Sequence, residues 1–186
     1  NLTGTNSVEF GQGVQLTTAC SGNVSLTIQP ASSFSNSAGG GAYALASIKV
    51  TNIPDSCFGS DFILNAYGET STAPLPLFNS TSTDAVIYNN AGTFQPGMGS
   101  TGMSVASASG QFTATFTVPV SLSKSIYRIT IQSGPHATLS CSLGGTCVVG
   151  DTGPGGGKIF YVSAGGFACG ITRSATCHYL ELAPTN

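Results

Sequence analysis

The side chains that could do chemistry are few in this chain of 186 residues. A Ser-His-Asp arrangement needs a histidine held by a carboxylate. Neither His136, in SGPHATL, nor His178, beside Cys177, lies in such a motif. Among the seven acidic residues, no two stand out as the paired carboxylates of a glycosidase. We therefore predict surface or packing roles for both histidines, no catalytic residues and no enzymatic activity.

The glycine-rich run GDTGPGGGKIF, from Gly150, differs from a phosphate-binding loop, because Ile159 follows Lys158 where Ser or Thr is required. A strand is expected to follow, so no helix N-terminus is available for a phosphate. A zinc site built from the C-terminal cysteines and His178 is an alternative, but CSLGGTC and CGITRSATC are spaced more widely than a zinc knuckle. No short loop gathers enough Asp or Asn for calcium. We predict no metal and no cofactor.

The cysteines indicate disulfides, because six of them in so polar a chain are typical of an oxidising compartment. Six cysteines allow fifteen pairings. Proximity in the chain favours Cys20 with Cys57, Cys141 with Cys147, and Cys169 with Cys177. Export also agrees with three glycosylation sequons, in which each asparagine could equally be an unmodified loop residue: Asn1, Asn23 and Asn79.

The charge content excludes several classes of partner. Only 6% of residues are charged, the net charge is -2, and the five Lys and Arg residues are scattered. Nucleic-acid binding needs clustered cations, so we expect no nucleic-acid partner. No apolar run approaches the ~20 residues of a membrane span. Because the first residue is Asn and no signal peptide is visible, we expect a processed protein or a fragment.

Alternation with a period of two dominates the chain and predicts β-strands. In QFTATFTV, side chains on one face are Phe112, Ala114, Phe116 and Val118. Similar patterns place Tyr127, Ile129 and Ile131 on one face, and likewise Val24, Leu26 and Ile28. Turn signals separate the strands, which predicts an all-β fold, an antiparallel Ig-like sandwich with a small C-terminal module.

The composition changes near Ser133, so we predict two domains. Residues 1–132 form the sandwich, with 1–13 as an N-terminal arm that donates a strand. Residues 133–186 form a small disulfide-stapled β module, too short for a full core of its own.

A covalent cross-link between strands is a further hypothesis. Lys49 lies in one apolar strand, and Asn65 lies in another, near Glu69. The ordinary interpretation, in which Lys49 points outward from an alternating strand, is favoured.

The C-terminal motifs CSLGGTC, GDTGPGGGKIFYV, CGITRSATC and HYLELAP carry a family resemblance. This stretch resembles a module of exported bacterial surface proteins, notably of actinobacteria, with GDxGPGGGxxFYV and YLEAAP-like segments. The region before it, with Cys20, Cys57 and FILNAYGET, looks like the accompanying sandwich. The resemblance implies an extracellular or cell-surface location and supplies no catalytic residue. In that family the module continues past the YLEAAP-like strand. We therefore expect the C-terminal module of this chain to be incomplete or to be completed by another molecule.

These observations favour a structural protein, a subunit of a surface filament, pilus-like appendage or layer. Low charge weakens repulsion between copies, and strand edges can be extended by another subunit. The expected partners are copies of the chain, with an arm carrying Leu2, Val8 and Phe10 that either reaches a neighbour or pairs with its own sheet. The alternative is a carbohydrate-binding or adhesin module, with glycan partners stacked on exposed aromatics: Tyr67, Tyr88 or Tyr161. A secreted hydrolase is the least supported.

Overall fold

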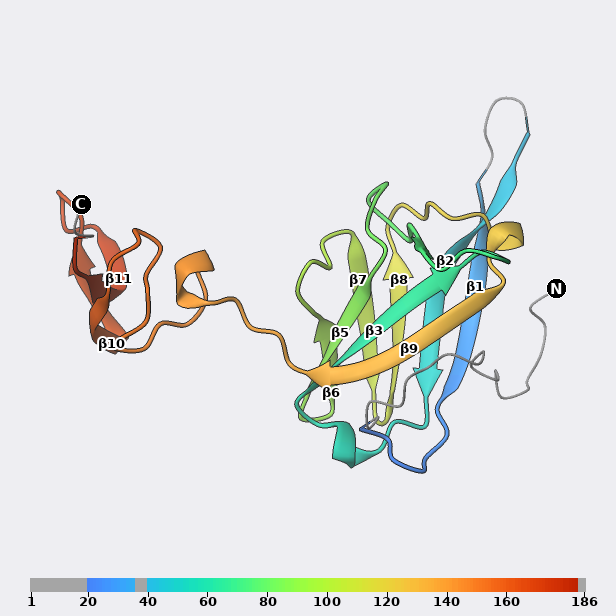
Figure 1. The fold of residues 1–186 in the computed structure, drawn as a ribbon, viewed down its shortest axis with the longest axis horizontal. Coiled ribbons are helices and arrows are strands. Elements are labelled where there is room, and N and C mark those ends of the chain that lie inside the picture. The colour runs from blue at the N-terminus through green and yellow to red at the C-terminus, as the bar shows by residue number, and fades with distance from the viewer. Residues whose placement is uncertain (1–19, 36–39, 184–186) are drawn as a thin grey trace. The chain divides into compact units, whose positions relative to one another are not determined.

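The computed structural model describes residues 20–35 and 40–183 and is all-β, as predicted (Figure 1). The chain divides into two compact units, Asn1–His136 and Ala137–Asn186. This boundary lies a few residues after the predicted one, because the last strand of the first unit continues to Pro135. The only helical segments in the described ranges are single 3-10 turns: η1 (Asp55–Cys57), η2 (Ser123–Ser125) and η3 (Cys141–Leu143).

Two antiparallel sheets build the first unit. Sheet A has the order β1-β2-β8-β7. Its strands are β1 (Thr27–Ser35), β2 (Ala42–Thr51), β7 (Met103–Ala108) and β8 (Gln111–Phe116). In sheet B, β3 pairs with β9 along one edge and with β4 and β5 along the other, and β6 pairs with β5. Its strands are β3 (Ser60–Tyr67), β4 (Pro74–Leu75), β5 (Ala85–Asn90), β6 (Thr93–Pro96) and β9 (Arg128–Pro135).

A core of aromatic rings and aliphatic side chains joins the two sheets, an arrangement consistent with the predicted Ig-like sandwich. The ring centroid of Phe112 in β8 lies 5.9 Å from that of Phe62 in β3 and 5.3 Å from that of Phe94 in β6. Phe78 stacks on Phe116 at 5.5 Å. Such pairs add about 0.5–1.5 kcal/mol each beyond the burial of their area.

The predicted alternation holds inside the strands and fails at their ends. Phe112 and Phe116 are buried, but Val118, predicted on the same face, is exposed because β8 ends at Phe116. Tyr127 is exposed for the same reason, since β9 begins at Arg128. Val24 precedes β1 and is also exposed.

The second unit is a small module around one hairpin, formed by β10 (Ile159–Cys169) and β11 (Ala175–Glu181). Its buried cluster is Cys141, Cys147 and Ile159, with Tyr179 packed against it. This core is far smaller than that of the sandwich, which agrees with the expectation that the module needs staples.

All six cysteines form disulfides, in the pairs that chain proximity favours. Cys20 bonds Cys57 across 37 residues, while Cys141–Cys147 and Cys169–Cys177 close short loops in the module. The cysteines that would supply thiolate ligands to zinc are therefore all oxidised to disulfides, and the zinc alternative is wrong. As for membrane association, the described residues include no helix with the length and apolarity to span a bilayer.

Candidate functional site

The glycine-rich loop of the module wraps the carboxylate of Glu181. The backbone N–H groups of Gly155 and Gly157 donate to the two oxygens of this side chain. A Cβ on Gly153 would overlap the same carboxylate, and a Cβ on Gly157 would overlap the carbonyl oxygen of Leu182. The loop thus resembles an anion-binding nest, but its anion is a side chain of the same module. Because the Glu181 carboxylate occupies these N–H groups, the nest holds the loop against β11 and is not a phosphate site.

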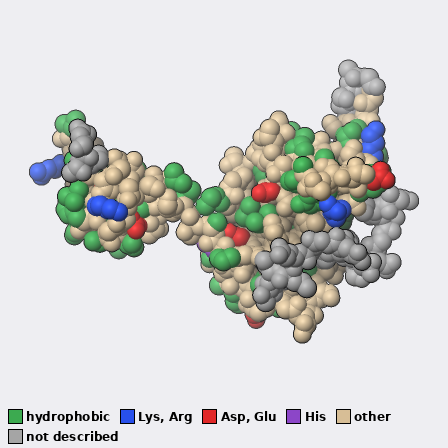
Figure 2. Space-filling view, viewed as in Figure 1, with side chains coloured by type: hydrophobic (Ala, Val, Ile, Leu, Met, Phe, Trp, Pro, Cys, Tyr) green, Lys and Arg blue, Asp and Glu red, His purple; other side chains and the backbone are tan. Residues whose placement is uncertain are grey.

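The β10–β11 hairpin presents apolar side chains to solvent. Their exposed fractions run from 38% to 53%, although all lie on or directly beside the paired strands: Phe160, Tyr161, Val162, Leu180 and Leu182. Apolar side chains are visible on the surface of the module in Figure 2. In the described chain, neither strand pairs with a third strand. A two-stranded hairpin is at best marginally stable alone, so this surface is suited to contact with another strand.

A carboxylate and a histidine meet on the sandwich, which the sequence did not predict. Nδ1 of His136 lies 2.8 Å from Oδ1 of the buried Asp61, and its ring stacks on Tyr88 with centroids 3.5 Å apart. His136 lies directly after β9, at the end of the first unit. An Asp-His pair is part of a catalytic triad, but no hydroxyl of the described residues hydrogen-bonds this imidazole. The pair therefore holds the end of β9.

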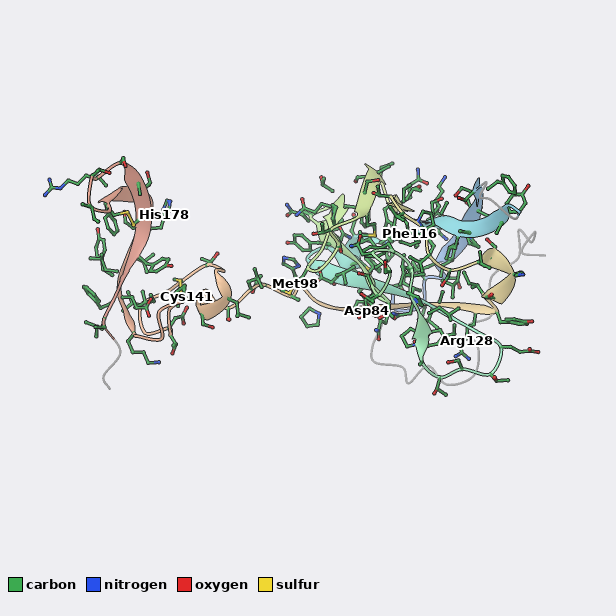
Figure 3. The ribbon with its side chains drawn as sticks, turned by 90° about the horizontal axis from the view of Figure 1, so that it is seen from above. Asp84, Met98, Phe116, Arg128, Cys141 and His178 are labelled. Carbon is green, nitrogen blue, oxygen red and sulfur yellow. A yellow bond between two sulfur atoms is a disulfide. The ribbon has the colours of Figure 1, made fainter. Side chains whose placement is uncertain are left out.

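Two further contacts lie on the same face of sheet B. Arg128, which is labelled in Figure 3, lies over the ring of Tyr67, 4.6 Å from its centroid. Asn65 donates its amide to the Asp84 carboxylate at 2.6 Å and to the Thr83 carbonyl. One face of the Tyr67 ring is thus covered by Arg128, and one face of the Tyr88 ring is covered by His136.

The cross-link hypothesis is wrong. Lys49 follows the buried Ile48 in β2, and Asn65 follows the buried Leu64 in β3. Because consecutive side chains point to opposite faces of a strand, both point away from the shared core, on opposite sheets. The carboxylate beside Asn65 is Asp84, and not Glu69 as predicted.

The remaining candidates lack the neighbours that chemistry needs. His178 is exposed, and its Nδ1 lies 3.2 Å from the Ser163 carbonyl oxygen. Within residues 20–35 and 40–183, no three His, Cys, Asp or Glu side chains gather closely enough to hold a metal ion. Asn1 and the arm residues Leu2, Val8 and Phe10 lie outside the described residues.

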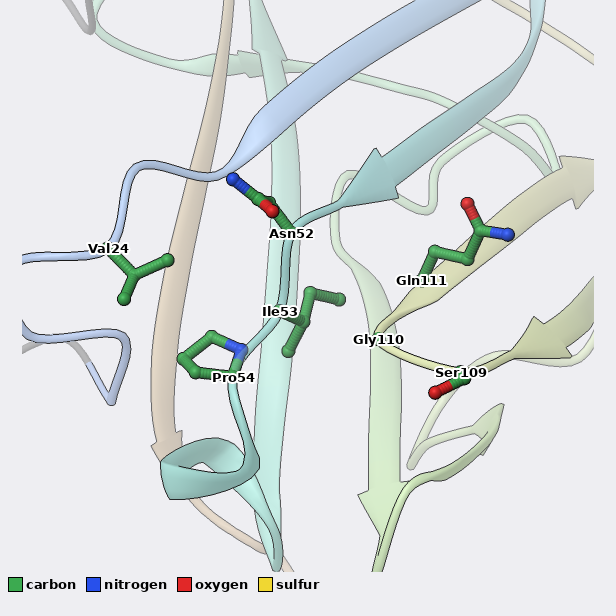
Figure 4. A pocket seen from close by; sticks show the side chains of 7 residues that line it. All are labelled: Val24, Asn52, Ile53, Pro54, Ser109, Gly110 and Gln111. Carbon is green, nitrogen blue, oxygen red and sulfur yellow. The ribbon is translucent and has the colours of Figure 1, made fainter.

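A shallow hollow of about 330 Å³ lies at one end of the sandwich, between the turn after β2 and the β7–β8 turn (Figure 4). Its lining carries no ionisable side chain: Val24, Asn52, Ile53, Pro54, Ser109, Gly110 and Gln111. Amide groups and small apolar side chains can hold a neutral polar group, but they supply neither an acid nor a base.

Comparison with known proteins gives no match: no protein-family model, no curated protein and no solved structure matches this chain. Its function is therefore argued from its own geometry. The strongest features are the exposed apolar hairpin of the module and the exposed aromatic side chains of the sandwich.

Proposed function

We propose that this protein is an extracellular structural subunit of a cell-surface filament, pilus-like appendage or layer, in which copies join through β-strand contacts. The observation that carries the proposal is the β10–β11 hairpin, whose strand residues Phe160, Tyr161 and Leu180 expose 41–49% of their surface. Leaving apolar side chains in water costs about 25 cal/mol per Å², and an unpaired strand edge is a template for another strand. Pairing with a second copy would bury the apolar side chains and would give the strand edge a hydrogen-bonded partner.

The covalent and charge properties support the same function. Three disulfides in 186 residues suit an oxidising, extracytoplasmic environment. A net charge of -2 gives copies little mutual repulsion. Most of the face seen in Figure 2 carries neither blue nor red side chains. The N-terminal arm, residues 1–13, is proposed as a second strand-donating contact with a neighbouring copy.

Assembly is tested with the full-length chain by light scattering and electron microscopy over a range of concentrations. We expect fibres or sheets, and we expect Phe160→Ser with Leu180→Ser to raise the concentration needed for assembly at least tenfold. Each apolar side chain that becomes buried in the contact stabilises the assembly by about 1.5–3 kcal/mol. A loss of about 1.4 kcal/mol weakens the association constant tenfold.

Ile171→Ser is the matched control, because Ile171 is fully exposed but lies in the loop between the two strands. It should leave assembly unchanged. Deletion of residues 1–13 separates the arm from the hairpin as the source of the contact. Monodisperse monomers of the wild type at high concentration contradict the proposal, and so does an equal effect of Ile171→Ser.

A carbohydrate-binding or adhesin role is the second candidate, and one exposed aromatic pair favours it. Phe34 in β1 and Tyr43 in β2 are cross-strand partners that expose 56% and 61% of their surface, with ring centroids 5.2 Å apart. This candidate predicts binding on a glycan array that Tyr43→Ala abolishes. Tyr127→Ala should leave that binding intact, since Tyr127 is equally exposed outside the pair. An array without hits removes the candidate.

A further inference from the structure

The asparagines of the two glycosylation sequons in the described chain are both exposed, but their side-chain amides differ in hydrogen bonding. One begins at Asn79, between β4 and β5, and the other at Asn23, directly before β1. Attachment of a sugar replaces one N–H of the asparagine amide with a bond to carbon, so it needs an amide that is accessible and not already committed to the fold.

The amide of Asn79 is committed to the fold. Its Nδ2 donates to the carbonyl oxygen of Thr101, and the backbone carbonyl oxygen of Asn79 separately accepts the N–H of Thr81 at 2.7 Å. The packing there is so close that a Cβ on Gly102 would overlap the Asn79 amide. Gly102 itself has φ 93°, a conformation that suits glycine. A pyranose on Nδ2 would take the second N–H of this amide and would crowd the backbone segment at Thr101 and Gly102.

The amide of Asn23 is open. Asn23 is exposed at the end of the turn of residues 20–23, and its side chain forms no hydrogen bond with any described residue. The other two sequon residues, Val24 and Ser25, are exposed as well. Val24 lines the hollow of about 330 Å³ (Figure 4), so none of the described residues fills the space beside the sequon.

The turn that carries Asn23 is also anchored at both ends. Cys20 is bonded to Cys57, and its N–H donates to the Ser133 hydroxyl in β9. Downstream, the Ser25 carbonyl accepts the Asn52 amide, and the Val24 N–H donates to the Ser21 carbonyl. The sequon is thus presented at the surface by contacts that do not involve the Asn23 side chain.

We propose that Asn23 carries an N-linked oligosaccharide, while Asn79 is an unmodified structural amide. The donor is a lipid-diphosphate-linked oligosaccharide. The Asn23 Nδ2–C1 bond forms as the C1–O bond to the diphosphate breaks, the lipid diphosphate leaves, and the amide loses one proton to a base of the transferase. The attached sugar then covers the exposed Val24 and the hollow beside it.

The test maps sugar on the full chain secreted from a cell that has an oligosaccharyltransferase. Peptides are released with an amidase in heavy-oxygen water, which converts a glycosylated asparagine into labelled aspartate. We expect the label at Asn23 and none at Asn79. Asn23→Gln should remove it without changing the thermal midpoint of the unglycosylated fold.

Asn79→Gln is the matched variant for the second half of the proposal. It should leave the Asn23 sugar in place and lower the thermal midpoint, because the amide loses its fit to Thr101. An unmodified Asn23, or a labelled Asn79, overturns the proposal. The result is independent of assembly, since neither sequon lies in the β10–β11 hairpin.

Discussion

We expect Gly157→Ala to unfold the C-terminal module while leaving the sandwich folded. Gly157 is buried, and a Cβ there would overlap the backbone carbonyl of Leu182, which cannot move like a flexible side chain. Overpacking of this kind costs about 1–3 kcal/mol. The module has little buried apolar surface to offset that loss of stability, since its buried cluster is only Cys141, Cys147 and Ile159.

The measurement is the amide NMR spectrum of the full chain together with limited proteolysis. Module signals should lose dispersion and residues 137–186 should become cleavable, while sandwich signals remain in place. Gly165→Ala is the control, because a Cβ at Gly165 in β10 meets nothing within 4 Å. If the two substitutions behave alike, the close fit of the loop around Glu181 is not what stabilises the module.

Removal of the Cys20–Cys57 disulfide is expected to cost the sandwich about 3–4 kcal/mol, since the bond closes a loop across 37 residues. Alanine is the better replacement, because Cys57 is completely buried and a serine hydroxyl would be left without a partner. The double variant Cys20→Ala with Cys57→Ala should therefore unfold at a lower urea concentration. The chain has no tryptophan, so circular dichroism is the appropriate probe.

The double variant Cys141→Ala with Cys147→Ala provides the comparison. It opens a loop across only 6 residues in the other unit, so the urea midpoint of the sandwich should not change. An unchanged sandwich midpoint in the Cys20 and Cys57 variant would show that β1 and β2 hold their positions without the bond.

Strand interiors were predictable from the sequence because burial on one face imposes a period of two. Phe112, Ala114 and Phe116 alternate with threonines in the sequence and are buried in the structure. Strand ends were not predictable, because exposure there depends on where the partner strand stops. Phe116 pairs with Met103, the first residue of β7, and Val118 lies beyond that pair.

Contacts between residues far apart in the chain could not be predicted from the sequence either. Asp61 in β3 and His136, directly after β9, are separated by 75 residues, and strand alternation does not indicate that they meet. The sequence excluded a phosphate in the glycine-rich loop, but it did not identify Glu181, 24 residues beyond Gly157, as the group that the loop binds. A glycine cluster followed by a single acidic strand residue is the signal that could have suggested it.

The Cys20–Cys57 disulfide determines how the chain responds to pulling at its two ends. When tension is applied through the two ends of the chain, force passes from Cys20 to Cys57 through the sulfur atoms. The segment between them, which includes β1 and β2, then adds no contour length when the subunit is stretched. The exposed Phe34–Tyr43 pair lies inside this segment. The backbone that carries this pair therefore lies outside the covalent path along which the force passes.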